Sequence, residues 1–496
     1  MNAFGVDVEV EVSRGIDRFD IVGLADVSVR ESKERIGSAF RSSKLKFPVG
    51  RVVVNLAPAD VKKSGSSHDL SIAVAVLAAS GYLDGDVLAG SAFIGELSLG
   101  GEIRAVNGVL PMAIFARKSG VRRLYVPKDN AFEASVVEGL EVYGVETLGE
   151  VSQILCGSRT LAPTPNYRPP EDAYFSGLDF CDVKGQQFAK KALEVAACGG
   201  HNVLLIGSPG SGKSMLAKRM PSILPKMTFE ESIETTNIYS IAGQINKDSP
   251  LVTARPFRSP HHTVSSAGLV GGGSIPRPGE ISLAHNGLLF LDEFAEFDRA
   301  ALEILRQPIE DGKVTISRAL GTVTYPCSIM IVAAMNPCPC GYYGHPKKKC
   351  SCSQRQVAAY LSRVSGPLLD RFDLHIEVAP VEYDSISSSQ KEEPSSLIRE
   401  RVQRAREIQQ KRFNGTGITC NARITSEYLH QVCPLTDAAN ELLKDVFDRL
   451  GLSARAYDRI LKVARTIADM DGSEPIDKKH IAQAVRYRSL DRKYWG

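Results

Sequence analysis

The alternation of apolar and polar residues divides the first third of the chain into short strands and helices. Val6–Val12 places a valine at every second position between charged residues, the pattern of a half-buried strand. Val27–Phe40 has helical spacing and carries mixed charges. Further strands are predicted at Val52–Leu56 and Leu124–Val126, and further helices at Leu70–Ala79 and Pro111–Ser119. The pattern therefore predicts an independent α+β domain up to residue 156.

Three continuous apolar runs in the middle of the chain predict buried parallel strands, because such strands are covered on both faces. They are Val203–Ile206, Gly287–Leu291 and Ile329–Met335. Helical patterns then occupy Leu397–Phe413 and the stretch from Thr425 to Arg488. We expect a parallel α/β core followed by an all-helical C-terminal domain.

Two polar stretches separate these parts. Residues 157–177 hold four prolines, which favour an extended, exposed linker. Residues 384–396 are rich in serine and glutamate. The predicted organisation is a domain at 1–156, a linker at 157–177, an α/β core at 178–383, a linker at 384–396 and a helical lid at 397–496.

The composition limits the domain number, the partners and the cellular location that we expect for the protein. A chain of 496 residues is long enough for several domains. The formal net charge of +3 excludes a general polycation, so any nucleic-acid surface must be local. We find no signal peptide and no apolar run long enough to span a bilayer. We therefore expect a cytoplasmic protein with no membrane partner, in which clustered cysteines bind metal.

The segment Gly207–Ser214 lies between a predicted strand and a predicted helix, the context that a phosphate-binding loop requires. Its glycines let backbone N–H groups surround an anion at the helix N-terminus. Lys213 would reach the β- and γ-phosphates of ATP, and the Ser214 hydroxyl would hold Mg²⁺. A glycine-rich turn without nucleotide is the weaker alternative. The predicted nucleotide-binding residues are Gly207, Ser208, Pro209, Gly210, Ser211, Gly212, Lys213, Ser214 and Met215.

Two acidic residues end the second buried run. Asp292 would hold Mg²⁺ or its water shell, and Glu293 would orient and deprotonate the attacking water. Acids at strand ends are often only solvated or helix-capping groups. Combined with a phosphate-binding loop upstream, they predict nucleotide hydrolysis.

Four cysteines follow the third apolar run as two close pairs: Cys338, Cys340, Cys350 and Cys352. Four thiolates supply a tetrahedral ligand set for a structural Zn²⁺. His345 could replace one ligand, and four unligated reduced cysteines are the alternative. Between the pairs, Lys347, Lys348 and Lys349 form either a solvated face or a contact for nucleic acid.

Two β-rich runs, Val314–Ser317 and Thr322–Thr324, predict a hairpin just before the third apolar run. Arg318 lies at its tip. Because a guanidinium binds phosphate well, we interpret the hairpin as a loop that grips a nucleic-acid backbone.

The order of loop, acids and a following Asn resembles that of AAA+ ATPases. The resemblance implies that Asn336 is the sensor 1 residue that positions the attacking water. It also implies that Arg371, in the segment Leu368–Asp373, is an arginine finger acting on a neighbouring subunit. The active unit would then be a ring, most often a hexamer in this superfamily.

The same resemblance assigns two further contacts to the nucleotide. Arg455 would be the sensor 2 residue that contacts the phosphates, with Arg459 as the alternative one turn later. Val183 and Gln186 would form a wall of the adenine pocket. A plain packing helix remains an alternative for these last two residues.

Two N-terminal segments, Asn55–Asp69 and Gly95–Ile103, resemble the proteolytic domain of Lon-type proteases. That resemblance places Ser67 near the nucleophile position. Leu110, however, stands where the family has the lysine that activates the serine. We therefore expect a Lon-like fold without peptidase activity, unless Lys62 or Lys63 substitutes for the missing base.

The stretch 237–280 is too long for a simple connection and resembles a helix-2 insert that projects into a central channel. It contains the segment Arg255–His262 and three consecutive glycines at 271–273. The adjacent histidines could bind metal, but we favour a structural or substrate-contacting role because no third ligand is evident. The candidate DNA contacts here are Arg255, Arg258, His261 and His262.

Over its full length the chain resembles the Mg-chelatase-like AAA+ proteins of the YifB/ComM family. The stretches Arg255–His262 and Asn336–Cys352 carry most of this resemblance. It implies a hexameric ATPase, with ATP, Mg²⁺ and a structural Zn²⁺, that drives DNA branch migration and helps to integrate single-stranded DNA in natural transformation or recombination. Its expected partner is single-stranded or branched DNA. A chelatase motor subunit is the main alternative, and an ATP-dependent protease is a weaker one because of Leu110.

Overall fold

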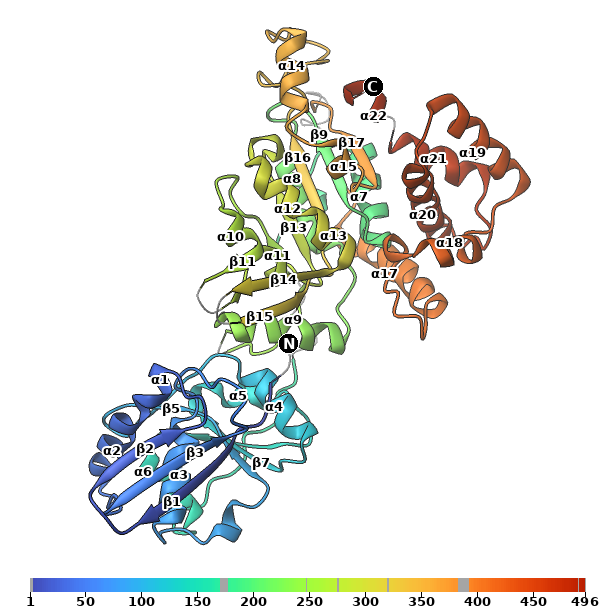
Figure 1. Ribbon diagram of the computed structural model, residues 1–496. Helices are drawn as coiled ribbons and strands as arrows, with labels where there is room; N and C mark the ends of the chain where they lie inside the picture. The colour runs from blue at the N-terminus through green and yellow to red at the C-terminus, as the bar shows by residue number, and fades with distance from the viewer. Residues whose placement is uncertain are drawn as a thin grey trace. The chain divides into compact units, whose positions relative to one another are not determined.

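The computed structural model describes residues 3–169, 177–246, 248–273, 276–318, 321–381, 392–488 and 490–495. The chain forms two compact units (Figure 1). The first comprises residues 1–170 and 232–252, and the second comprises residues 171–231 and 253–496. Most of the predicted linker at 384–396 lies outside the described residues.

The first unit has two three-stranded sheets. In one, β3 (Arg51–Ala57) lies between antiparallel β1 (Asp7–Ser13) and parallel β2 (Arg18–Val22). In the other, β4 (Ser91–Phe93), β7 (Arg123–Pro127) and β8 (Glu141–Val145) are parallel. Its remaining elements are α1 (Val27–Arg30), α2 (Ser32–Ser42), α3 (Asp69–Ala79), α4 (Val109–Lys118), α5 (Ala131–Ala134), α6 (Leu148–Leu155), β5 (Glu96–Leu97) and β6 (Ile103–Arg104). The predicted α+β character is confirmed.

This unit is not formed by the N-terminal sequence alone. Residues 232–252 also belong to it, and they include most of the helix α9 (Phe229–Ala242). Leu251 packs with the buried Leu110, and the Ser240 hydroxyl donates to the Glu133 carboxylate at 2.5 Å. Residues 232–252 therefore join the domain that the sequence predicts at 1–156. Tertiary contacts between segments far apart in sequence leave no local pattern.

The second unit contains a parallel five-stranded sheet in the order β10-β13-β16-β9-β17. The predicted strands appear as β9 (Val203–Ile206), β13 (Leu288–Leu291) and β16 (Met330–Met335). The edge strands are β10 (Phe257–Arg258) and β17 (Leu374–Glu377). Because all five strands are parallel, their carboxyl ends meet at one edge, where ligands bind in open α/β sheets.

The strand β10 corrects one prediction. Its two residues fall inside the stretch 237–280, which we predicted to be a single projecting insert, yet Phe257 pairs with Leu288 in the main sheet. A strand of two residues beside Pro256 is too short for periodicity to reveal. The predicted insert therefore consists of a part in the first unit, a sheet strand and the residues after it.

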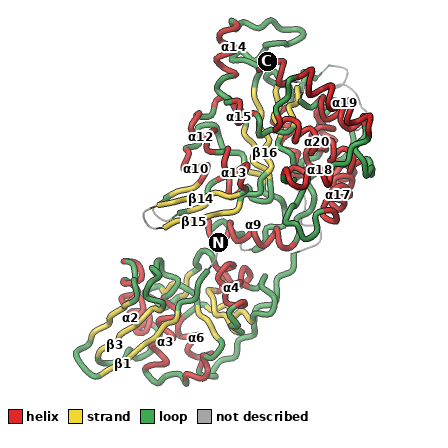
Figure 2. The backbone as a smooth tube through the Cα atoms, turned by 45° about the vertical axis from the view of Figure 1, so that its right-hand side comes forward, coloured by secondary structure: helices red, strands yellow, loops and turns green. Residues whose placement is uncertain are grey.

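Several short elements surround the sheet. The predicted hairpin is confirmed as β14 (Lys313–Arg318) paired with β15 (Gly321–Pro326), the two strands seen side by side in Figure 2. The others are α7 (Gln187–Gly199), α8 (Lys213–Arg219), α10 (Ser266–Val270), β11 (Gly271–Gly272), β12 (Arg277–Pro278), α11 (Glu280–Leu283), α12 (Arg299–Ile304), α13 (Arg306–Asp311), α14 (Gln354–Leu361) and α15 (Gly366–Leu369).

The C-terminal part is helical, as predicted. It comprises α17 (Ser395–Arg412), α18 (Ser426–Val432), α19 (Asp437–Leu450), α20 (Ala454–Met470), α21 (Lys478–Arg486) and α22 (Leu490–Trp495). Its buried residues, such as Ile460 and Ile481, share one hydrophobic core with the strands of the sheet. None of the helices in the described ranges is long and apolar enough to cross a membrane.

Candidate nucleotide site and cysteine cluster

The side chain of Lys213 turns into the phosphate-binding loop at the carboxyl end of β9. Its ammonium group donates to the carbonyl oxygens of Gly207 at 2.7 Å and Ser208 at 3.0 Å, and to Asn336 Oδ1 at 3.2 Å. Burial lowers the pKa of Lys213 to about 8. The Lys213 ammonium thus contacts Asn336, which lies 123 positions later in the sequence. A γ-phosphate would replace these weaker acceptors.

The loop backbone has the conformation that its sequence predicts. Gly210 and Gly212 adopt left-handed φ angles of 76° and 95°, which favour glycine. Met215 packs against the core from the first turn of α8. The loop therefore presents its turn at the helix N-terminus, where the dipole favours an anion.

Ser214 and Asp292 form a pair of hard oxygen ligands. The Ser214 hydroxyl donates to Asp292 Oδ2 at 2.6 Å, although the two residues lie 78 positions apart. Mg²⁺ is held by such oxygens together with water and phosphate. The residues therefore fit the predicted Mg²⁺, which would draw charge from the phosphate oxygens when bound.

Glu293 follows Asp292 in a left-handed conformation, with φ at 52°. Its side chain is 59% exposed, and its Oε2 lies 3.0 Å from His262 Nδ1. The ring of His261 lies beside that of His262, with centroids 4.1 Å apart. His261 in turn contacts the Thr263 hydroxyl at 2.9 Å. The structure thus gives His262 a contact with the candidate catalytic base.

The predicted adenine-wall residues have different environments. Val183 is completely buried in the core, so it supports the site from behind. Gln186 donates to the loop carbonyl of Ser211 at 3.2 Å and to that of Ala379 at 2.5 Å. It also lines a cavity of about 500 Å³, together with Phe188. None of the loop residues 207–214 lines this cavity, but Gln186 connects it to the loop through Ser211, and we take it as the candidate base pocket.

Arg371 and Arg455 line a second cavity, of about 330 Å³, which none of the loop residues 207–214 lines. Arg371 is only 4% exposed. It donates to the Pro367 carbonyl at 2.6 Å and forms an ion pair with Glu310. Three further cationic side chains line the cavity: Arg423, Arg459 and Lys462. The structure therefore brings both predicted phosphate-contacting arginines to one basic cavity away from their own loop.

Several residues of this cavity escaped sequence reasoning. Glu310 lies on α13 and Arg423 precedes α18, so nothing in their local sequence connects them with Arg371. The alternative sensor 2 residue, Arg459, forms an ion pair with Asp373 at 3.2 Å. Burial and the nearby Arg455 lower the pKa of Arg371, whereas Glu310 raises it.

The sulfur atoms of Cys338, Cys340, Cys350 and Cys352 lie within 4.8 Å of one another. Three of the S···S distances are 3.4, 3.7 and 3.5 Å. A tetrahedral Zn²⁺ with bonds of about 2.3 Å separates its sulfurs by about 3.8 Å, so the cluster fits this ion.

Backbone groups support the cluster. The N–H of Tyr343 donates to Cys338 Sγ at 3.3 Å, and that of Cys352 donates to Cys350 Sγ at 3.4 Å. Such donors, that of Tyr342 foremost, lower the pKa of the Cys340 thiol to about 5, which favours the thiolate that binds metal. In the part of the chain that the structure describes, His345 is not a member of the cluster, because its Nδ1 accepts from the backbone of Lys347.

We expect the protein purified without chelator to contain about one zinc ion per chain, because four thiolates at tetrahedral spacing bind it tightly. Replacing Cys338, the most buried of the four, by serine should abolish this content. Elemental analysis measures it, and Cys156→Ser, an exposed cysteine outside the cluster, is the matched control. Wild-type protein free of zinc would contradict the assignment.

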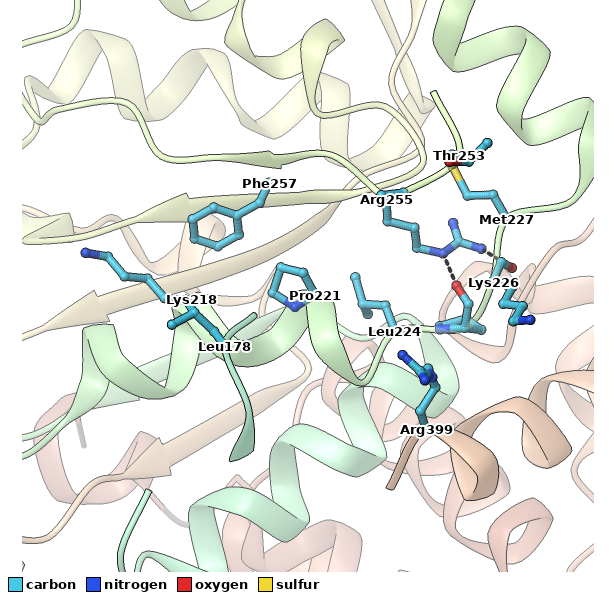
Figure 3. Close-up of a pocket in the computed structure, with 12 residues that line it drawn as sticks. Leu178, Lys218, Pro221, Leu224, Lys226, Met227, Thr253, Arg255, Phe257 and Arg399 are labelled. Atoms are coloured by element: carbon cyan, nitrogen blue, oxygen red, sulfur yellow. Dashed lines mark hydrogen bonds between the residues drawn. The ribbon is translucent and has the colours of Figure 1, made fainter. Parts of the chain in front are cut away.

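The candidate DNA contacts differ in what they can reach. Arg255 donates to three backbone carbonyls and to Glu231, and its side chain is only 14% exposed. Figure 3 shows it at one end of an apolar cavity of about 330 Å³, beside Met227. Arg258 makes two bonds of 2.7 Å to Glu280. Both guanidinium groups thus have partners within the chain.

The remaining cationic candidates lie at the surface. Arg318 is exposed at the end of β14. Lys347, Lys348 and Lys349 are exposed beside the cysteine cluster, and the ammonium of Lys348 lies 4.8 Å from the ring centroid of Tyr342. These side chains keep donors available for phosphate.

Comparison with known proteins covers nearly the whole chain. The family described as "Magnesium chelatase, subunit ChlI" matches residues 179–386, and its C-terminal counterpart matches residues 392–488. "Subunit ChlI of Mg-chelatase" matches residues 8–130.

Three curated proteins illustrate the similarity. Competence protein ComM of Haemophilus influenzae is 44% identical over 492 residues, which cover 98% of this chain and 95% of that protein. The uncharacterized protein YifB of Escherichia coli is 44% identical over 499 residues, covering 99% and 96%. A DNA repair protein RadA of Listeria monocytogenes is 39% identical over 94 residues, covering 19% and 20%.

Proposed function

Since this chain belongs to the Mg-chelatase ChlI-like YifB/ComM family of AAA ATPases, we propose that it is an ATP-driven ring that moves DNA strands. It acts as a branch-migration helicase or translocase in recombination or natural transformation, in the cytoplasm. The observation that carries the proposal is the meeting of Lys213, Ser214, Asp292 and Asn336 at one edge of the parallel sheet. The family implies ATP hydrolysis, and this is the site at which it would occur.

The chain's own residues supply the chemistry of hydrolysis. Lys213 and the loop N–H groups hold the β- and γ-phosphates, while Ser214 and Asp292 hold Mg²⁺. Asn336, within 3.2 Å of the Lys213 ammonium, positions the attacking water. Glu293 accepts a proton from that water as general base. Mg²⁺ would neutralise charge that develops on the phosphate oxygens.

The position of the second basic cavity supports the proposed ring. Arg371 and Arg455 line a cavity that the chain's own phosphate-binding loop does not line. A guanidinium stabilises the transferred phosphoryl group only when it reaches it. We therefore assign both arginines to the nucleotide of a neighbouring subunit, in a homo-hexamer.

DNA is the proposed substrate for two reasons. Two of the similar proteins are named for competence and for DNA repair. The exposed Arg318 and the lysines at 347–349 offer local positive charge on a chain that is nearly neutral overall. DNA affinity should therefore fall steeply with salt, because phosphate contacts dominate it.

Replacing Arg318 by alanine should weaken binding to single-stranded DNA several-fold at low salt. It should also reduce the slope of log K against log salt concentration by about one, because one phosphate contact is lost. Fluorescence anisotropy across a salt series measures both. Arg449→Ala is the matched control, since that side chain is 76% exposed on α19. Equal slopes for Arg318→Ala and wild-type protein would remove Arg318 from the DNA surface.

A chelatase motor is the second candidate, because the family models that match carry the name of magnesium chelatase. The two functions differ in what stimulates ATP hydrolysis. A DNA motor should hydrolyse ATP faster with single-stranded or branched DNA, whereas a chelatase motor should respond to a porphyrin-binding partner instead. If no DNA structure stimulates ATP hydrolysis, the proposed function is wrong.

We propose that the N-terminal part has a Lon-like fold without peptidase activity. Leu110, at the position of the family's lysine, is completely buried. The Lys63 ammonium donates to the Pro58 carbonyl, which weighs against its serving Ser67.

A further inference from the structure

The cysteine cluster belongs to a loop whose two ends meet at the candidate nucleotide site. The loop leaves β16 at Asn336, whose side chain accepts from Lys213. It returns through α14, which begins after a capping box at Ser353. On α14 the buried side chain of Tyr360 lies near the backbone of Asn336. The segment 336–360, here called the cysteine loop, therefore begins and ends beside the sensor residue.

The cysteine loop also touches the phosphate-binding loop directly. A Cβ atom built on Gly341 would lie 2.4 Å from Pro209 Cδ and 2.6 Å from its Cγ. Such distances are far below van der Waals contact, so only glycine fits at this position. Gly341 also has a left-handed φ of 82°, and its N–H donates to the Cys338 carbonyl at 3.0 Å. Gly341 in the cysteine loop is thus packed against Pro209 in the loop that would surround the phosphates.

No regular secondary structure orders this part of the cysteine loop. Residues 339–352 contain no helix or strand, and their side chains are mostly exposed. None of their hydrophobic side chains is buried, whereas Cys338, just before them, is. With a metal, the ligand bonds of the four cysteines fix the loop, because binding free energy becomes folding free energy.

We propose that metal binding at the four cysteines and nucleotide binding at the phosphate-binding loop are positively coupled. The metal-bound cysteine loop holds Gly341 against Pro209 and Asn336 beside Lys213, so the nucleotide meets an ordered site. This proposal rests on the proposed ATPase function and adds a regulatory input to the same site. Agents that remove the metal would then lower ATP affinity without touching a nucleotide-binding residue.

Coupling of this kind is reciprocal. If the metal raises nucleotide affinity by a given factor, the nucleotide must raise metal affinity by the same factor. Zinc retention therefore reports the coupling without any measurement of hydrolysis. Couplings between sites are typically about 5- to 150-fold, and a direct packing contact places the expected effect at fivefold or more.

The experiment follows zinc transfer from the purified full chain to the chelator TPEN, with and without a non-hydrolysable ATP analogue and Mg²⁺. Saturating analogue should slow the transfer about fivefold or more in wild-type protein. Lys213→Ala should keep its zinc but show no protection, because it lacks the phosphate contact. Gly341→Ala should show weakened protection, because its Cβ pushes the two loops apart. Gly417→Ala is the matched control, with a similar φ of 75° and nothing within 4 Å.

The outcomes separate this proposal from the function on which it rests. Equal rates of zinc transfer with and without analogue, in protein that fluorescence shows to have bound it, overturn the coupling and leave the ATPase intact. Failure to bind the analogue overturns both. Protection in wild-type and Gly417→Ala protein that is lost in Lys213→Ala protein supports the coupling.

Discussion

Replacing Arg371 by alanine is expected to lower the rate of ATP hydrolysis about 10³-fold while leaving ATP affinity nearly unchanged. A guanidinium in this role acts on the transition state, and its removal costs about 10³- to 10⁵-fold in turnover. Arg371 is 4% exposed and paired with Glu310, so ring assembly must free it from that pair. Steady-state hydrolysis and equilibrium binding of a fluorescent ATP analogue measure the two quantities.

Mixed rings supply the control for this prediction. An Arg371→Ala subunit keeps a complete phosphate-binding loop, and a Lys213→Ala subunit keeps its arginine. Mixing the two inactive proteins should restore part of the activity, because some interfaces then combine an intact loop with an intact arginine. A mixture as inactive as its components, or an Arg371→Ala protein with wild-type turnover, would refute action across subunits.

Replacing Glu293 by glutamine is expected to lower hydrolysis about 10²- to 10⁴-fold, the range that a general base contributes. Glutamine keeps the size of the side chain and can still contact His262, which lies 3.0 Å from the carboxylate. ATP should bind with unchanged affinity and accumulate on the protein. Single-turnover measurements separate binding from cleavage.

The contact with His262 provides a second variant for this prediction. His262→Ala removes the neighbour of the Glu293 carboxylate and leaves the carboxylate itself. Its effect on turnover should be much smaller than that of Glu293→Gln. If turnover by Glu293→Gln stays within a few-fold of wild type, another group must activate the water.

The parts of the nucleotide site that sequence could predict are local. Each consists of a few consecutive residues after an apolar strand, such as Gly207–Ser214 or Asp292 and Glu293. The sheet then brings them together, because parallel strands place their carboxyl ends at one edge. The same logic applies to the cysteines, whose two pairs lie within fifteen residues of each other.

The rest could not be predicted because it depends on contacts between distant segments. Arg255 has the sequence context of a surface residue, yet three backbone carbonyls and Glu231 enclose its guanidinium. Residues 232–252 join the first unit through the contact of Ser240 with Glu133, 107 positions away. The contact of Gly341 with Pro209 is equally invisible, since a glycine can serve many roles.

The central claim, that ATP hydrolysis moves DNA strands, is tested most directly by branch migration of a synthetic three-strand junction. Wild-type protein with ATP and Mg²⁺ should convert the junction to exchanged products, and Lys213→Ala should convert none. Sequence-matched linear duplex serves as the control for simple melting. Robust ATP hydrolysis by the wild-type protein without any strand exchange, on junctions that it binds, would contradict the account.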